Sequence, residues 1–221
     1  MSWEPAAFLY RSNKLMYDHA TKSMWSTLTG APVVGPLVGR GIELESLHVV
    51  TTTWTEWRRR HPETLVLSLD TGYRRDYSEG AAYREYFSSD RLMFGVPKRD
   101  DRLPNKAEVL ALRLPQASGE SLAVAAEFLA SRPVYQDRIA GVNFVVLTDA
   151  AGANRVYEAR GVTFINWDSK VWVVSDSDGG RWKMDEDALT ASTGERLKRL
   201  PAHRAFWFGW NAAFPATRLV K

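Results

Sequence analysis

The sequence contains no cysteine among its 221 residues. This absence excludes disulfide bonds, thiolate metal sites, iron–sulfur clusters and cysteine nucleophiles. A chain of this length can bury about 70% of the surface that its unfolded form exposes, so folding does not require a cross-link. We therefore expect a core held together by ordinary side-chain packing.

The sequence also has little excess charge of one sign and no long apolar run. It carries 29 basic and 26 acidic residues, a formal net charge of +3. Nucleic-acid-binding proteins usually concentrate basic residues, whereas the dense run Arg58-Arg59-Arg60-His61 is typical of a solvated helix face. No segment approaches the about 20 apolar residues that cross a membrane, and residues 1–10 lack the apolar core of a signal peptide. We expect a cytoplasmic protein with no nucleic-acid or membrane partner.

Tryptophan, in contrast, is abundant, with nine residues, and it indicates an internal repeat. A first stretch reads Trp54-Thr55-Glu56-Trp57 and continues with Pro62, Thr64 and Val66. A second stretch, 153 positions later, reads Trp207-Phe208-Gly209-Trp210 and continues with Pro215, Thr217 and Leu219. The same offset carries Leu44 onto Leu197 and Leu47 onto Leu200. We interpret this as two copies of one unit; the alternative is a convergent pattern at two helix ends.

Each copy predicts a short helix followed by a short strand. Thr53 is a good N-cap with Glu56 three residues later, so we expect a helix over 53–60 and a strand over 65–67. The second copy predicts a helix over 205–213, apolar almost all round and therefore buried or covered by a partner. An antiparallel meander over 143–184 precedes that helix, and we expect no such meander in the first copy.

These patterns predict an α+β fold, mostly antiparallel β with short helices, in which two related halves surround a shared interface. Residues 1–67 form the first, truncated copy, and residues 138–221 form the second. Residues 68–137 are a middle connection that includes a helix over 120–131, whose apolar stripe has helical spacing. We expect one compact unit.

Several motifs together resemble a bacterial family of uncharacterised domains, DUF3179. The motifs are Arg11-Ser12-Asn13-Lys14-Leu15-Met16-Tyr17-Asp18, Trp54-x-x-Trp57, and Asp70-Thr71-Gly72-Tyr73-Arg74-Arg75-Asp76-Tyr77. Members of that family typically carry a Cys-Pro-Leu-Cys-type stretch before the first motif, and this sequence does not. It therefore resembles a trimmed, cysteine-free member, similar to peptide-binding accessory proteins of peptide natural-product (RiPP) biosynthesis.

Signatures of catalysis are missing from the sequence. It has no Gly-x-Ser-x-Gly nucleophile motif and no glycine motif that cradles phosphates or dinucleotides. The four histidines are scattered, and none has another histidine three or four positions away. We predict no metal, no cofactor and no catalytic residue, although folding could still bring two carboxylates together for acid–base work.

Binding chemistry is better represented, above all in residues 73–77. Two guanidinium groups flanked by aromatic rings could hold a carboxylate and stack on a side chain; the alternative is an internal Arg–Asp network. Tryptophans in a cleft between two similar halves could bind apolar side chains, although burial in the core is the commoner role of tryptophan. Our candidate ligand-binding residues are Trp25, Trp54, Tyr73, Arg74, Arg75, Asp76, Tyr77 and Arg102.

From these observations we predict a non-catalytic peptide-binding protein. The resemblance implies an accessory role, in which the protein holds a ribosomal precursor peptide for partner biosynthetic enzymes. The alternative is an enzyme, a cyclase or isomerase, acting on the same peptide, which requires a cleft with a close carboxylate or histidine pair of perturbed pKa. A third possibility is a structural module that docks a protein through the apolar segment 205–214.

Overall fold

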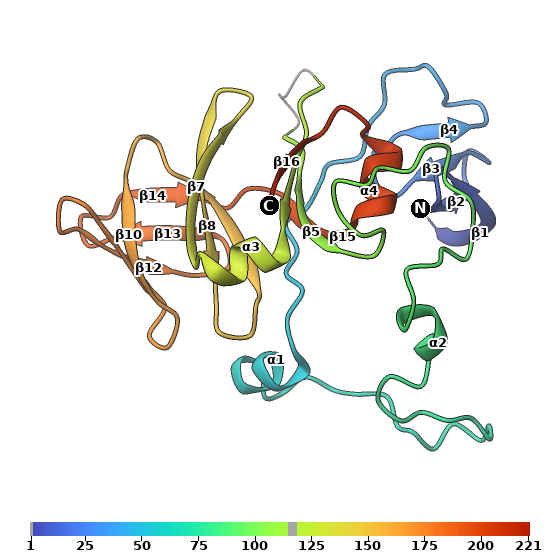
Figure 1. The fold of residues 1–221 in the computed structure, drawn as a ribbon, viewed down its shortest axis with the longest axis horizontal. Coiled ribbons are helices and arrows are strands. Elements are labelled where there is room, and N and C mark those ends of the chain that lie inside the picture. The colour runs from blue at the N-terminus through green and yellow to red at the C-terminus, as the bar shows by residue number, and fades with distance from the viewer. Residues whose placement is uncertain (1, 115–118) are drawn as a thin grey trace.

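A computed structural model describes residues 2–114 and 119–221 of the chain (Figure 1). Within these ranges the strands form four β-sheets, and the helices are short. Every strand pair in them is antiparallel except one, which confirms the expected mostly antiparallel α+β class. None of the helices described there is long and apolar enough to cross a membrane.

The central sheet has the strand order β15-β5-β6-β16. Its members are β5 (Glu108–Leu112), β6 (Leu122–Ala125), β15 (Ala202–Phe206) and β16 (Arg218–Val220). The pair β16–β6 is the parallel one. Helix α4 (Trp207–Ala213) connects β15 to β16 and packs Trp207 and Trp210 against one face of the β5–β6 hairpin. The apolar second helix is therefore buried within the chain, which excludes it as a docking surface for another protein.

A three-stranded sheet covers the other face of the central sheet. It consists of β7 (Val134–Ile139), β8 (Val142–Thr148) and β9 (Asn154–Glu158). Strand β8 is buried on both faces, as its continuous apolar sequence predicted. Phe144 and Val146 face the core shared with the central sheet, whereas Val145 and Leu147 face the opposite core.

A five-stranded antiparallel meander packs on that opposite face. Its strands are β10 (Phe164–Asp168), β11 (Val173–Asp176), β12 (Arg181–Met184), β13 (Ala188–Ala191) and β14 (Arg196–Lys198). Trp182 and Leu189 are among the residues that fill the core between the meander and β8. The layers therefore follow one another as five-stranded sheet, three-stranded sheet, central sheet and α4 (Figure 1).

The N-terminal residues form a second meander, contrary to our expectation. Its strands are β1 (Trp3–Tyr10), β2 (Asn13–Asp18), β3 (Met24–Ser26) and β4 (Pro32–Val34), paired in chain order. The turn after β2 is built like the turn after β12. The Asp18 carboxylate accepts hydrogen bonds from the amides two and three residues later (2.8 and 3.3 Å), and Asp185 does the same (2.8 and 2.7 Å). The sequence pattern does not indicate this meander, because most of its strands are short and contain both polar and apolar side chains.

The helix predicted over 120–131 is wrong in its first half. Residues Leu122–Ala125 form β6, and the helix α3 is confined to Ala126–Ser131. A run of small apolar residues fits a buried strand as well as a buried helix. Here both faces of the run are covered, because Leu122 and Val124 face one core and Ala123 faces α4. Sheet pairing therefore decided the conformation.

The two tryptophan helices have the same local construction. Helix α1 (Trp54–Arg60) starts after Thr53, which accepts the Glu56 amide at 3.3 Å as expected for an N-cap. The Trp57 indole donates to the Thr64 hydroxyl at 2.9 Å, and the Trp210 indole donates to the Thr217 hydroxyl at 3.0 Å. Their C-cap residues have nearly identical backbone angles, φ −129° and ψ 68° or 74°.

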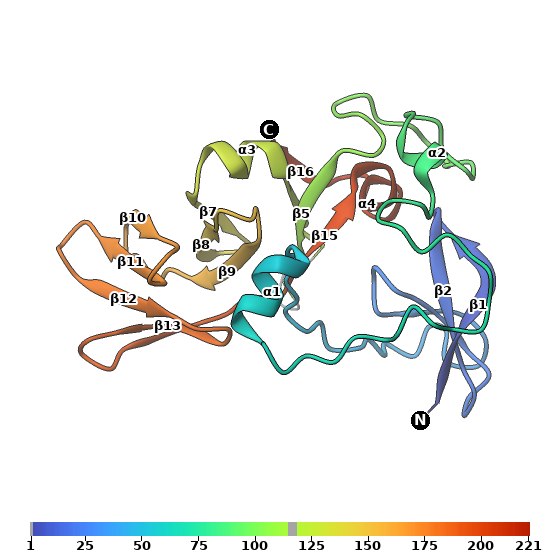
Figure 2. The ribbon, with the colours of Figure 1, turned by 90° about the horizontal axis from the view of Figure 1, so that it is seen from below.

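The surroundings of the two helices differ. No residue of α1 is buried, whereas five residues of α4 are. The strand predicted over 65–67 does not form: these residues have no regular secondary structure and pair with no strand in the described part of the chain. The chain then continues through exposed segments and the single-turn helix α2 (Arg84–Phe87) to β5 (Figure 2).

Charged groups hold α1 against the sheets. Arg60 pairs with Glu186 at 2.6 Å, and its guanidinium lies 3.6 Å from the centre of the Trp172 ring. Arg155, 1% exposed, also pairs with Glu186 at 3.1 Å, and Arg199 approaches the same carboxylate. Although burial raises the pKa of Glu186, hydrogen bonds and charge from these guanidinium groups outweigh it and lower the value to about 2.

Candidate functional site

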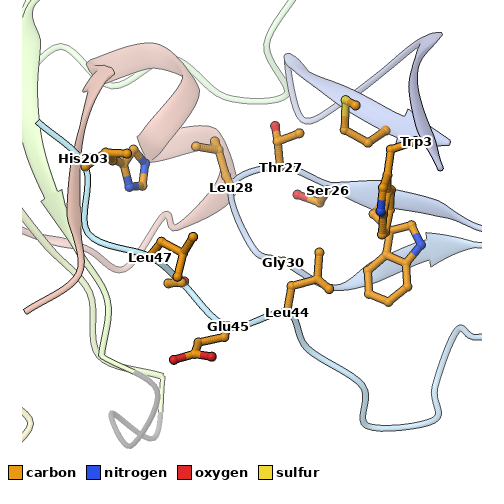
Figure 3. Close-up of a pocket in the computed structure, with 13 residues that line it drawn as sticks. Trp3, Ser26, Thr27, Leu28, Gly30, Leu44, Glu45, Leu47 and His203 are labelled. Atoms are coloured by element: carbon orange, nitrogen blue, oxygen red, sulfur yellow. The ribbon is translucent and has the colours of Figure 1, made fainter. Parts of the chain in front are cut away.

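A pocket of about 440 Å³ lies between the N-terminal sheet and the edge of the central sheet (Figure 3). One wall comes from β1 to β3 and the turn after them, the opposite wall from residues 44–49, and one end from β15. The lining residues are Trp3, Met16, Trp25, Ser26, Thr27, Leu28, Gly30, Leu44, Glu45, Ser46, Leu47, Val49 and His203. Volumes of a few hundred Å³ suit a small ligand or one or two side chains of a larger one.

Residues 44–49, here called the strap, form one wall because both ends are tethered. The Leu44 amide donates to the Gly30 carbonyl at 2.8 Å, and the Val49 amide donates to the Ala202 carbonyl of β15 at 3.5 Å. Gly30 has φ +69°, and a Cβ there would lie 3.1 Å from the Leu44 carbonyl oxygen. Glycine therefore permits both the turn and the close approach of the strap.

Two tryptophans form the end of the pocket at the N-terminal sheet. Trp3 and Trp25 meet edge to face with ring centroids 5.4 Å apart. Trp25 is fixed in the sheet and only 4% exposed. The turn after the neighbouring strand is held by Asp18, whose pKa is lowered chiefly because the Thr21 hydroxyl donates to its carboxylate. The aromatic end is thus held in place by the sheet and by the turn that follows β2.

His203 forms the end of the pocket at β15, as Figure 3 shows. Its ring lies 5.7 Å from the Trp210 ring, edge to face. Burial lowers the pKa of His203, so the imidazole is neutral near pH 7. Its Nε2 is buried and has no hydrogen-bond partner among the described residues. A buried polar atom without a partner gains from a ligand that supplies one.

The pocket can therefore hold an apolar or aromatic group, with two buried polar atoms, His203 Nε2 and Trp25 Nε1, that have no hydrogen-bond partner among the described residues. Leu28, Leu44 and Leu47 line its length between the tryptophans and the histidine (Figure 3). Leu47 is 75% exposed, so the strap side is open to solvent and a ligand can extend beyond the pocket. The arrangement favours a side chain carried on a longer molecule.

Acid–base chemistry has weaker support at this site. The titratable groups that line the pocket are Glu45 and His203, and Figure 3 shows the Glu45 carboxylate pointing away from the imidazole. No hydrogen bond or ion pair joins the two. In the ranges that the structure describes, no group of three or more His, Asp or Glu side chains is placed to hold a metal ion.

The structure does not gather the eight predicted site residues into one place. Trp25 lines the pocket, while residues 73–77 lie on the segment between α1 and α2, which extends away from the sheets (Figure 1). There Tyr73 is 74% exposed, Asp76 accepts from Ser78, and Tyr77 bonds Thr71 at 2.8 Å. The ion pairs of the described residues include neither Arg74 nor Arg75, so the alternative of an internal Arg–Asp network does not form there.

Trp54 and Arg102 lie in two further places. Trp54 is 48% exposed on α1. Arg102 pairs with Asp100 at 2.9 Å and lies 5.1 Å from the Trp207 ring centre, so it helps to cover the core. Ligand binding by these residues and by residues 73–77 stays a prediction.

Most of the pocket was not foreseen from the sequence. Trp3 and His203 gave no local signal, because the fold brings together residues 200 positions apart. Leu44 and Leu47 did give one, since they match Leu197 and Leu200 at the repeat offset. Their partners are fully or partly buried, whereas Leu44 and Leu47 are 45% and 75% exposed. The sequence therefore gives the match of these leucines, whereas their exposure, which marks them as part of a site, is seen only in the structure.

The curated proteins and the solved structures include no match to this chain. A family model described as "Protein of unknown function (DUF3179)" matches residues 2–217, nearly the whole sequence. The motifs around Asp18, Trp54 and Asp76 that suggested this resemblance all fall inside the matched range. The chain therefore belongs to the DUF3179 family.

Proposed function

We propose that this protein binds a peptide without transforming it, and that the pocket between the N-terminal sheet and β15 receives an apolar or aromatic side chain of that peptide. The observation that carries the proposal is the combination of a two-tryptophan end, an apolar length and a single uncharged histidine. Fully burying one aromatic or large aliphatic side chain contributes about 1.5–3 kcal/mol, which selects for that side chain by roughly ten- to a hundredfold, while contacts of the peptide backbone add to the affinity.

The open strap supports a peptide rather than a free small molecule. An enclosed ligand would need cover on all sides, whereas Leu47 and Val49 are more than half exposed beside the pocket. A peptide backbone could lie along the strap, because the backbone of residues 45–48 makes no hydrogen bond to any residue that the structure describes. The strap is tethered to β15, the edge strand of the central sheet, and extended peptides commonly bind beside a sheet edge, with main-chain bonds for affinity and a pocket for specificity.

We also infer that the pocket lies between two copies of one ancestral unit. The matched helices, the matched aspartate turns and the two meanders support a duplication. Trp3, Trp25 and the strap belong to residues 1–67, whereas His203 belongs to residues 138–221. A cleft between related halves is a frequent place for a ligand.

We also propose an accessory role for this binding. The bound peptide is a ribosomal precursor, and the protein presents it to modifying enzymes of a natural-product pathway. Support for this comes from the resemblance of the sequence alone. The pocket supports the more general statement that an apolar side chain of a peptide is held.

Calorimetry with capped pentapeptides tests the binding. The probes are three peptides of four alanines with a central Phe, Leu or Asp. We expect the Phe and Leu peptides to bind and the Asp peptide to bind at least about tenfold more weakly, because a carboxylate would lose its hydration in an apolar pocket. Unchanged mass and retention after incubation with purified protein are expected; turnover would favour the enzyme alternative.

A matched pair of variants locates the binding. Leu47→Asp places a charge in the pocket wall at a position exposed enough to leave folding intact, and it should remove most of the Phe-peptide binding. Val171→Asp makes the same change at a 59% exposed valine between β10 and β11 and should leave binding unchanged. Equal binding by wild type and Leu47→Asp, or no binding of any probe, contradicts the proposal.

A further inference from the structure

The β5–β6 hairpin shows what a tryptophan helix of this chain covers. In the central sheet the hairpin lies between the two strands that flank α4, with β15 antiparallel to β5 and β16 parallel to β6. Small residues of the hairpin, Val109, Ala111 and Ala123, face Trp207 and Trp210. With this cover, both tryptophans are only 1% exposed.

Helix α1 has the same frame but lacks this cover. Trp54, the counterpart of Trp207, is 48% exposed. The residues that correspond to β16 are 95%, 68% and 92% exposed at Leu65, Val66 and Leu67. Among the described residues, none of the four sheets includes the segments 49–53 and 65–67 that flank α1.

The exposed fractions of Leu65, Val66 and Leu67 are too large, for three consecutive apolar residues, to be typical of a protein surface. Monomeric proteins rarely leave a run of apolar residues with free backbone groups in solvent, because such a run accepts another strand. Leu65 and Leu67 would share one face of a strand and Val66 would take the other. A segment apolar on both faces is the pattern of a strand covered on both sides.

We propose that α1 and its two flanking segments, 49–53 and 65–67, form an acceptor for a two-stranded β-hairpin of a partner polypeptide. By correspondence with the central sheet, the hairpin lies antiparallel to residues 49–53 and parallel to residues 65–67. It presents small side chains to Trp54 and Trp57 and larger apolar side chains on its other face. The acceptor overlaps the wall of the pocket at Val49, and its correspondence with the central sheet rests on the duplication proposed above.

A second copy of this chain is a poorer occupant than a different polypeptide. The hairpin that matches the acceptor, β5–β6, is buried on both faces in its own molecule, with Leu110 and Leu122 in one core and Val109 and Ala123 in the other. Donating it would open both cores. The partner therefore supplies a hairpin that is free in its own structure.

A designed hairpin is the probe for this acceptor. It carries the strand sequences of β5 (Glu108–Leu112) and β6 (Leu122–Ala125) joined by an Asn-Gly turn, which favours the two-residue hairpin. We expect saturable binding, a change in tryptophan fluorescence, and slower hydrogen exchange of the amides of residues 65–67. A control hairpin with one strand shifted by one residue turns its side chains to the wrong faces and should bind at least about tenfold more weakly.

Variants separate this proposal from the pocket and from other occupants. Leu67→Asp should abolish hairpin binding, while Leu47→Asp and Val171→Asp should retain it. No protection of residues 65–67 at saturating hairpin, or equal binding of the shifted control, overturns the proposal. A dimer of the chain alone in light scattering that Leu67→Asp dissociates would instead make a second copy the occupant, which also overturns it.

Discussion

Helices α1 and α4 share a backbone frame, yet one is exposed and the other forms a core. Each places an indole 2.9–3.0 Å from a threonine hydroxyl seven residues later. In each helix the tryptophan that donates this hydrogen bond also packs its ring against the residue four positions later. The ring centroids are 4.2 Å apart for Trp57 and His61 and 4.3 Å apart for Trp210 and Phe214. The local conformation is therefore independent of burial.

The difference between the helices lies in what holds each of them in place. Apolar packing on β5 and β6 holds α4, and its last turn carries no charged residue. Ion pairs and a cation–π contact hold α1, whose last turn consists of Arg58, Arg59 and Arg60. The comparison shows that a short motif can fix a turn of helix, while the covering hairpin determines how much stability the helix contributes.

Truncating the equivalent tryptophans tests this difference most strongly. Trp210→Ala removes a side chain that is 1% exposed and should lower the free energy of unfolding by about 3–5 kcal/mol. Trp57→Ala removes a half-buried side chain and should cost less than about 1.5 kcal/mol. Urea unfolding followed by circular dichroism measures both. Similar losses for the two variants would mean that α1 carries a core role that its exposure conceals.

Acid should loosen α1 before α4, because α1 is held by charge. The pKa of Glu186 is lowered from 4.5 to about 2 in the folded chain, first by its pairing with Arg155 and then by Arg60 and Arg199, against the opposing effect of burial. As the pH falls, the Glu186 carboxylate is therefore protonated in the unfolded chain before it is protonated in the folded chain. The stabilisation is complete above pH 4.5 and is lost as the pH falls toward 2.

Partial exposure limits the size of this effect. The Glu186 side chain is 33% exposed, so solvent screening reduces the contribution to about 2 kcal/mol or less. Hydrogen exchange should show the amides of α1 losing protection over that pH range while those of α4 retain theirs. Glu186→Gln should reproduce the loss at neutral pH. Simultaneous loss at both helices would show that the network supports the whole fold rather than α1.

The sequence predicted much of the β framework, for reasons visible in particular residues. Strand β8 was expected because its run of apolar residues is bounded by turns, and α1 because Thr53 and Glu56 mark a helix start. Residues 122–125 are predicted to be helical because the apolar residues of 120–131 have helical spacing, but a run of small apolar residues also fits the buried strand that forms. Residues 65–67 were assigned to a strand because their composition favours one, although pairing requires a neighbour.

The candidate site was predicted much less well. Trp25 is a predicted site residue because a tryptophan in a cleft can bind apolar side chains, and it does line the pocket. Residues 73–77 were named because arginine and tyrosine can bind a carboxylate, but composition does not indicate where a loop lies. His203 and Trp3 line the same pocket only because β15 packs near the N-terminal sheet. Such contacts depend on tertiary structure, which local sequence patterns do not encode.

The two indole–threonine hydrogen bonds provide the finest comparison between the helices. Thr217 is 3% exposed, and Thr217→Val would leave the Trp210 indole N–H without a partner in a dry core, at a cost of about 1–3 kcal/mol. Thr64→Val makes the same change beside the half-buried Trp57, where water can replace the hydroxyl, so the cost should be below about 0.5 kcal/mol.

Thermal unfolding of the two variants measures this difference, with Thr217→Ser as the control that retains the hydroxyl. Serine should recover most of the loss, because the bond rather than the methyl group is responsible. If Thr217→Ser is as unstable as Thr217→Val, packing of the methyl group, and not the hydrogen bond, explains the loss of stability. If Thr64→Val proves equally costly, water does not reach Trp57, and the two helices are more alike in solution than their exposed surfaces indicate.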